Sequence, residues 1–302
     1  MKFKPMKNKR LIYCVLFALF VKIPVFPQSI DDFIGKYKES NGQGYIQPFA
    51  DVFGASFNTG LFHSAMIKKM GFQAYLGVMT TAAFIPDKRK TFMATTEGSF
   101  TPVKTEEVPT ILGPADPVEV SGDGGTVYVF PGGLNATLLP FAVPQLTLGS
   151  VLGTDVTIRY FAYSINEDIG NLNLLSLGIR HSISQYFSAL PLDLAVGFYI
   201  QQLKLGDIID YNSWMASVQA SKRVKIFTFY GGLGYENSKM KIEYTNQDDD
   251  TSISFDLTGS NNIRFTAGIT FNFGPVKFNV DYSLASQSVL CAGLGIGIGE
   301  KK

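Results

Sequence analysis

The sequence is poor in several residue types, and each shortage excludes a class of protein. Only two of its 302 residues are cysteines, Cys14 and Cys291, so it holds no framework of intramolecular disulfides. Charged residues make up 17% of the chain, where an average soluble domain has about 25%, and the net charge is +1. A disulfide-rich secreted domain is therefore excluded, and no basic field attracts the chain to nucleic acid.

Long hydrophobic runs are also scarce, and the one that stands out lies at the start. Basic residues are concentrated in residues 1–10, an apolar run covers residues 11–21, and Pro24 and Pro27 break it. A membrane helix needs about 20 apolar residues, so this short run predicts a secretory signal peptide at residues 1–28. An uncleaved anchor is the alternative. No later segment is apolar over a length that would make a membrane helix.

In place of long runs, the sequence has regular alternation. From residue 262 to residue 273 each odd position is apolar, as at Ile263 and Phe265, and each even position is polar or glycine, as at Arg264 and Thr266. Segments of about ten residues with this period of two are typical of strands that cross a membrane. Such segments are found at residues 71–84, 136–149, 154–164, 171–183, 192–204, 211–221, 225–236, 262–273, 276–285 and 289–299.

The connections between these segments alternate in length, as they do in outer-membrane barrels. Short turns are expected at residues 184–191, 221–224 and 273–276, and longer loops at residues 165–170, 204–210 and 237–261. The last of these predicts an extended hairpin with arms at residues 239–245 and 252–258. Residues 85–135 hold several prolines and the pair Gly124-Gly125, which predict a long loop with one hairpin between residues 91–96 and 126–130.

These patterns predict an all-β fold, a closed antiparallel transmembrane β-barrel of about 10–14 strands with an N-terminal pre-barrel or plug segment. A soluble β-sandwich also alternates, but its outer face should be well charged, whereas the polar phase here is mostly uncharged. Ile263 and Ile269 are expected to face lipid. Arg264, Lys277 and Asp281 then face the lumen, where opposite charges on adjoining strands can pair.

The organisation expected is a signal peptide at residues 1–28, a second segment at 29–65 and the barrel at 66–302. Residues 31–40 have helix-like spacing, and an apolar stretch that includes Tyr45 and Phe53 follows them. The second segment is either a periplasmic lead-in or a plug in the lumen. The plug is favoured because these aromatic side chains would otherwise be exposed to water.

A set of charged residues falls on the polar phase of the strands and is expected to line the lumen. The set is Asp155, Arg159, Arg180, Asp193, Arg264, Lys277 and Asp281. These side chains could select or contact a solute, as charged rings do in pores. Alternatively, they pair with one another as the polar filling of a narrow barrel, which is favoured because acidic and basic residues are balanced.

The sequence predicts no enzyme, no cofactor and no metal site. A nucleophile needs a positioned base, commonly histidine, and the only histidines are His63, which precedes the barrel, and His181, expected at the membrane interface. The glycine-rich residues 121–126 lack the lysine and spacing of a phosphate loop and predict a turn. Three consecutive acids at 248–250 lack the alternating ligands of a calcium loop and predict a solvated loop tip.

Several short motifs resemble a family of uncharacterised Bacteroidota outer-membrane β-barrel proteins. They are SNGQGYIQPFAD at residues 40–51, GASFNTGLFHSA at 54–65, MGFQAY at 70–75, VPTILGP at 108–114, FYGGLGYE at 229–236 and VLCAGLGIG at 289–297. The resemblance implies a barrel without assigned catalytic residues. An apolar N-terminal segment ahead of a barrel is also similar to the layout of long-chain fatty-acid transporters.

The function expected from the sequence is that of an outer-membrane barrel in contact with outer-membrane lipid, acting as a passive channel for a small or hydrophobic solute. The alternative is a non-transporting surface scaffold or a subunit of an envelope complex. Fold alone does not decide between them.

Overall fold

The computed structural model describes residues 37, 39–166, 170–187, 190–245 and 252–299. The expected signal peptide at residues 1–28, most of the expected helix at 31–40 and the acidic triplet at 248–250 lie outside the described residues.

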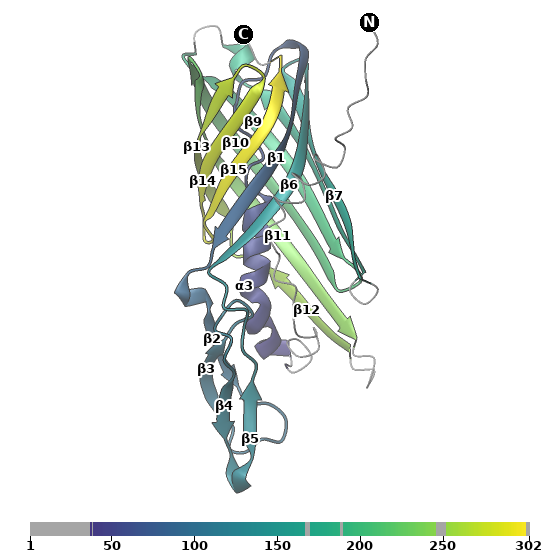
Figure 1. The fold of residues 1–302 in the computed structure, drawn as a ribbon, viewed down its shortest axis with the longest axis vertical. Coiled ribbons are helices and arrows are strands. Elements are labelled where there is room, and N and C mark those ends of the chain that lie inside the picture. The colour runs from purple at the N-terminus through teal and green to yellow at the C-terminus, as the bar shows by residue number, and fades with distance from the viewer. Residues whose placement is uncertain (1–36, 38, 167–169, 188–189, 246–251, 300–302) are drawn as a thin grey trace, which may run out of the picture.

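Ten of the described strands close into an antiparallel barrel (Figure 1). They are β1 (Met70–Phe84), β6 (Leu138–Val151), β7 (Thr154–Asn166), β8 (Gly170–Ser182), β9 (Asp193–Leu205), β10 (Ile209–Val224), β11 (Phe227–Thr245), β13 (Ile263–Phe273), β14 (Val276–Leu284) and β15 (Val289–Ile298). The first and last of them pair antiparallel, with Val78 opposite Leu294, which closes the cylinder. The predicted closed antiparallel barrel is confirmed, at the lower end of the expected strand number.

The outer wall of the barrel is apolar and its inner wall is polar, because successive side chains of a strand point to opposite faces. On β13, Ile263 and Phe265 are exposed on the outer face, while Arg264 and Thr266 are buried on the inner one. Leu294, in the middle of β15, is 58% exposed in the isolated chain. A closed sheet with an apolar outside satisfies every backbone group in lipid, as a transmembrane barrel must.

The long helix in the described part of the chain, α3 (Glu39–Phe57), runs along the inside of the barrel and out of one end (Figure 1). Residues on all its sides are buried, as expected of a helix enclosed by the rest of the chain. Gly54 lets the helix approach the wall, since a Cβ there would lie 2.7 Å from Oγ of Ser238 on β11. Neither α3 nor any other helix in the described part of the chain is long and apolar enough to cross a membrane.

Beyond this end of the barrel lies a folded extension, which we call the head. It comprises residues 86–137, the first half of α3, the outer part of β11 and the strand β12 (Ser252–Thr258), which pairs with β11. Residues 86–137 include the short 3-10 turns η1 (Asp87–Arg89) and η2 (Asp123–Gly125). Tyr45 of α3, Phe130 and Phe255 belong to one hydrophobic cluster that continues into the barrel.

Residues 86–137 of the head contain two hairpins where the sequence predicted one. Strand β2 (Thr91–Thr95) pairs with β3 (Thr105–Pro109), and β4 (Val118–Ser121) pairs with β5 (Val127–Phe130). The predicted pairing of residues 91–96 with 126–130 is therefore wrong. Strand β3 could not be predicted from alternation, because it carries two adjacent glutamates and a proline instead of alternating apolar residues.

The other end of the barrel, the short-turn end, carries the short connections predicted at residues 184–191 and 273–276. The connection at 184–191 includes the 3-10 turn η3 (Ser184–Tyr186). The turn predicted at residues 221–224 lies later in the chain, because β10 continues to Val224 and β11 begins at Phe227. The chain between α3 and β1, residues 58–69, passes along the lumen toward this end, and we call it the plug segment (Figure 1). Its contacts with the barrel wall make up the candidate functional site.

Candidate functional site

Arg264 of β13 joins the barrel wall to the end of α3. Its Nε and Nη2 each donate a 2.9 Å hydrogen bond to the carboxylate of Glu236 on β11. Its Nη1 donates to Oγ1 of Thr59 at 2.6 Å, and Nη2 also donates to the carbonyl oxygen of Ala55 at 2.9 Å. Both charged side chains are buried, so the pair is almost dry. The guanidinium therefore neutralises a buried acid and caps a helix carbonyl at once.

Arg159 of β7 makes a second connection of the same kind. Its Nε donates to Oε1 of Gln145 on β6 at 2.8 Å, which orients the guanidinium. Its Nη1 and Nη2 donate to the carbonyl oxygens of Phe57 and Thr59, both at 3.1 Å. These are among the last carbonyls of α3 and the first after it, and the helix leaves such groups without intrahelical partners.

Arg180 of β8 holds the far part of the plug segment. It forms a two-pronged pair with Asp155 on β7, at 2.9 Å and 2.5 Å, and the two residues face each other across the β7–β8 ladder. Its Nη1 donates to the carbonyl oxygen of Ser64 at 2.6 Å and to Oε1 of Gln219 at 3.3 Å. Each bond to a charged group contributes more than a neutral one.

Together the three arginines fasten α3 and the plug segment to three strands of the wall, β7, β8 and β13. Arg159 and Arg264 lie at the C-terminal end of α3, where the helix dipole is negative. Buried charges are costly unless they are paired and hydrogen-bonded, as Arg180 and Arg264 are. Arg159 is hydrogen-bonded to Gln145 and to two backbone carbonyls. Neutral bonds add to the attachment: Oγ1 of Thr270 donates to the carbonyl of His63 at 2.8 Å, and the Ala65 amide donates to Oγ of Ser221 at 2.9 Å.

Nearer the head, Asp51 of α3 makes a comparable contact, in which the helix supplies the negative charge and the surrounding residues supply the positive one. Its carboxylate pairs with Arg89 of η1 and accepts a 2.7 Å hydrogen bond from the backbone amide of Ser260. Arg89 also donates to Oγ of Ser260 at 2.9 Å. The second half of the helix is therefore fastened at two levels, to the inner wall by arginines at its C-terminal end and to the rim by Asp51.

Within the head, Tyr37 and Tyr45 form an aromatic pair with ring centroids 5.2 Å apart. The hydroxyl of Tyr45 donates a 2.8 Å hydrogen bond to the carbonyl of Gly132, which ties α3 to the loop after β5. Burial raises the pKa of both phenols above their ordinary value, because it disfavours the phenolate.

All seven charged residues singled out from the sequence are buried on the inner side of the wall. Asp155 and Arg180 pair with each other, whereas Arg159 and Arg264 bind the plug segment instead of an acid of this set. Asp281 accepts a 2.8 Å hydrogen bond from the hydroxyl of Tyr230. The role of these residues toward a solute stays a prediction.

The pairing expected across the hairpin of residues 262–282 is wrong. Arg264 pairs with Glu236 on the strand on its other side, and Nζ of Lys277 donates to Oδ1 of Asn272 at 2.9 Å. Asp281 stands opposite Gly268 on β13, so no cation faces it directly across that ladder.

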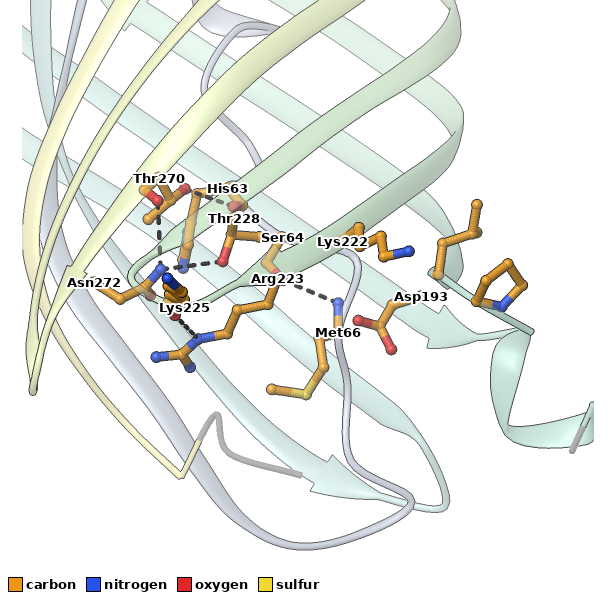
Figure 2. A pocket seen from close by; sticks show the side chains of 12 residues that line it. His63, Ser64, Met66, Asp193, Lys222, Arg223, Lys225, Thr228, Thr270 and Asn272 are labelled. Atoms are coloured by element: carbon orange, nitrogen blue, oxygen red, sulfur yellow. Dashed lines mark hydrogen bonds between the residues drawn. The ribbon is translucent and has the colours of Figure 1, made fainter. Parts of the chain in front are cut away.

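A pocket opens at the short-turn end, with a volume of about 480 Å³ (Figure 2). The plug segment lines it with His63 and Ser64. The end of β10 contributes the cations Lys222 and Arg223, and the turn after it contributes Lys225. Asp193 is the one acid among the lining residues.

Sequence reasoning missed most partners of the arginines. Glu236 lies on the polar phase of β11, so the alternation of this strand could have identified it as a partner in the lumen. Gln145, Thr59 and Ser64 have no distinguishing pattern, because an uncharged polar residue in a barrel or a plug is common. The carbonyls that accept the guanidinium bonds are backbone groups and leave no trace in a sequence.

The residues weighed for catalysis do not assemble into a triad. His181 contacts Oγ1 of Thr154 and the hydroxyl of Tyr186, both at 2.8 Å, near the short-turn end. Cys291 is buried on β15. The part of the chain that the structure describes has no cluster of three or more His, Cys, Asp or Glu side chains that could hold a metal ion. The expectation that the protein is not an enzyme stays a prediction.

A protein-family model matches residues 6–298 of the sequence, which is nearly its whole length. The model describes a family of unknown function, DUF6588. The chain belongs to this family. No curated protein matches the sequence. Membership agrees with the resemblance to an uncharacterised barrel family, while an origin in Bacteroidota stays a prediction.

Several solved structures are similar to the chain at low identity. The attachment invasion locus protein Ail of Yersinia pestis is 14% identical, with 76% of this chain and 98% of that chain covered and a TM-score of 0.26. The toluene transporter TbuX of Ralstonia pickettii is 8% identical, with 83% and 98% covered and a TM-score of 0.29. The translocator domain of the autotransporter NalP from Neisseria meningitidis is 10% identical, with 89% and 99% covered and a TM-score of 0.30. TM-scores this low carry no argument about the fold. The barrel is established by the strand pairing of this chain itself.

Proposed function

We propose that the protein is an outer-membrane barrel which its own N-terminal segment keeps closed, and which holds the folded head at the cell surface. Barrels of this kind have short turns on the periplasmic side and long loops outside. The head replaces the long loops of β1–β6 and β11–β13, so this rule puts it outside the cell. Its shared hydrophobic core makes it a folded unit able to present a binding surface.

The observation that carries the proposal is the attachment of α3 and the plug segment by Arg159, Arg180 and Arg264. A narrow barrel fills readily with side chains, and this one also holds a helix. Moving the plug segment would leave buried guanidinium groups without the carbonyl oxygens of Thr59 and Ser64, although pairs within the wall such as Arg264–Glu236 would stay intact. A hydrogen bond to a charged group contributes about 1.5–3 kcal/mol, so an open state that loses several of them would be sparsely populated.

A second candidate is the passive conduit for a small or hydrophobic solute expected from the sequence. The specific observation in its favour is the pocket at the short-turn end, which reaches Ser64 of the plug segment. A solute could continue past this point only if the plug segment moved. In this case the arginines would hold a closed state that opens from time to time.

Planar-bilayer conductance separates the two candidates. The scaffold predicts no openings for the wild-type protein, and the conduit predicts openings. A Ser64→Cys/Ser221→Cys variant adds a control, because the two Oγ atoms lie 3.4 Å apart and a disulfide would join the plug segment to β10. Openings that disappear on oxidation of this variant would establish the conduit and overturn the closed scaffold.

Location and sidedness need a separate measurement. An epitope tag inserted in η2, where Gly124 and Gly125 have open space around them, should bind antibody on intact cells. A tag in the turn after Val224, at the short-turn end, should bind only after the outer membrane is permeabilised. Recovery of the chain in the soluble fraction, or the opposite labelling pattern, would contradict the proposal.

A further inference from the structure

The pocket at the short-turn end has features of a site for an anion. Its volume of about 480 Å³ falls within the range of small-ligand pockets. Lys222 and Arg223 at the end of β10 line it, together with Lys225 in the turn after β10. Asp193 is the one acid among the lining residues, so the cations outnumber it. Figure 2 shows these side chains around the opening, together with His63, Ser64 and Met66 of the plug segment.

The connection between β10 and β11, beside which the cations lie, is held in place by the neighbouring strand β13. Asn272 of β13 binds the carbonyl oxygen of Ile226 twice, from its backbone amide at 2.7 Å and from its side-chain Nδ2 at 3.0 Å. Nε of Arg223 donates to the carbonyl oxygen of Lys225 at 3.2 Å. Lys225 itself has a φ of 56°, in the left-handed region that side chains seldom adopt. These contacts fix the backbone that carries Lys225 in a strained conformation. The positive charge is therefore positioned before a ligand binds.

Apolar side chains surround the charged opening on its outer side. Val224 and Ile226 in the same turn are 46% and 43% exposed, and Leu190 in the adjacent turn is 37% exposed. They continue the apolar outer wall of the barrel to this end. A ligand that used both surfaces would place an anionic group on the cations and a hydrocarbon part on the wall.

We propose that this pocket binds the phosphate headgroup of an anionic phospholipid from the inner leaflet. The short-turn end lies at the level of this leaflet if the barrel has the orientation given above, and the inference rests on that orientation. Basic residues beside an apolar membrane surface attract anionic headgroups. The apolar rim favours a lipid over free phosphate, because free phosphate has nothing to place against Val224 and Ile226.

The test uses the folded full-length protein in zwitterionic detergent. Short-chain phosphatidylglycerol, short-chain phosphatidylcholine and inorganic phosphate are titrated separately, and affinity is measured by calorimetry. We expect phosphatidylglycerol to bind more tightly than either of the others. The Lys222→Gln/Lys225→Gln variant should bind it about tenfold more weakly, since each lysine near a headgroup contributes to attraction.

The matched control is Lys239→Gln/Lys241→Gln, which removes the same charge from exposed positions of β11 at the head end. It should bind phosphatidylglycerol as the wild type does. Equal affinity for phosphatidylglycerol and phosphatidylcholine, binding of inorganic phosphate alone, or equal losses in both variants would each overturn the proposal. Heat-modifiable gel mobility confirms that each variant is folded, and the conductance and surface-labelling results do not depend on lipid binding.

Discussion

Arg264 and Glu236 lie side by side on neighbouring strands of the barrel, joined by two hydrogen bonds of 2.9 Å, and both are buried. The same guanidinium reaches the carbonyl oxygen of Ala55 in α3. One pair of residues therefore connects the wall of the barrel with what fills it.

Removing one member of this pair should destabilise the protein strongly. Arg264→Met leaves the Glu236 carboxylate buried without its partner, and we expect a loss of about 3–5 kcal/mol of unfolding free energy. Urea unfolding in lipid vesicles, followed by the fluorescence of the single tryptophan, Trp214, measures it. Lys204→Met, in an exposed pair with Asp210, should change stability by less than about 1 kcal/mol. Equal losses of unfolding free energy in the two variants would mean that water reaches the Arg264–Glu236 pair.

A charge on the outer wall should be costly only where the wall meets lipid. Leu294→Arg, near the middle of β15, is expected to cost about 2–4 kcal/mol. Val127→Arg on β5 of the head is the control, because this side chain is 54% exposed but lies beyond the barrel. We expect a change within about 0.5 kcal/mol there. Tolerance of arginine at both positions would contradict a membrane-spanning wall.

Gly60 should be intolerant of a side chain for two separable reasons. Its φ is 69°, and a Cβ would lie 2.6 Å from Sγ of Cys291. Gly98 has a similar φ of 71° but open space around it. Gly98→Ala should therefore show only the backbone cost, about 1–2 kcal/mol. Gly60→Ala adds crowding of about 1–3 kcal/mol and should increase protease cleavage of the plug segment. Cleavage equal to that of Gly98→Ala would show that the plug segment adjusts freely.

The head should lose stability at alkaline pH. Because burial raises the pKa of Tyr45 in the folded head, the folded state holds this proton more tightly than the unfolded chain does. The resulting stability is fully present below about pH 10 and is lost as the pH rises further. Near-ultraviolet circular dichroism should show the loss, and Tyr45→Phe should reduce its pH dependence. An unchanged alkaline profile in that variant would assign the effect to other groups.

Most of the barrel could be predicted from alternation alone. Ile263, Arg264, Phe265 and Thr266 point to the faces expected of them, because the period of two leaves a strand only two choices. Alternation does not show how tightly the inner face is packed, however. Thr270 is 1% exposed and its hydroxyl binds the plug segment, so the inner face is packed and not open to water.

The head and the plug contacts were harder to predict, for physical reasons. Strand β3 forms because β2 pairs with it over its whole length, and its own residues favour no strand. Arg159 was expected in the lumen, but its bonds to the carbonyls of Phe57 and Thr59 depend on where an aperiodic segment lies. Every residue has a backbone carbonyl, whatever its side chain. A contact to such a carbonyl therefore leaves no pattern in the sequence.

The order of the chain also limits how the molecule can be assembled. The plug segment leads directly into β1, and β1 closes the cylinder against β15, so Ala74 meets Ile298 across almost the whole length of the described chain. Every other neighbouring pair in the barrel joins strands that are closer in sequence than β1 and β15 are. Closing the wall around the helix therefore depends on the β1–β15 seam, and pairing over such a separation in sequence is slow.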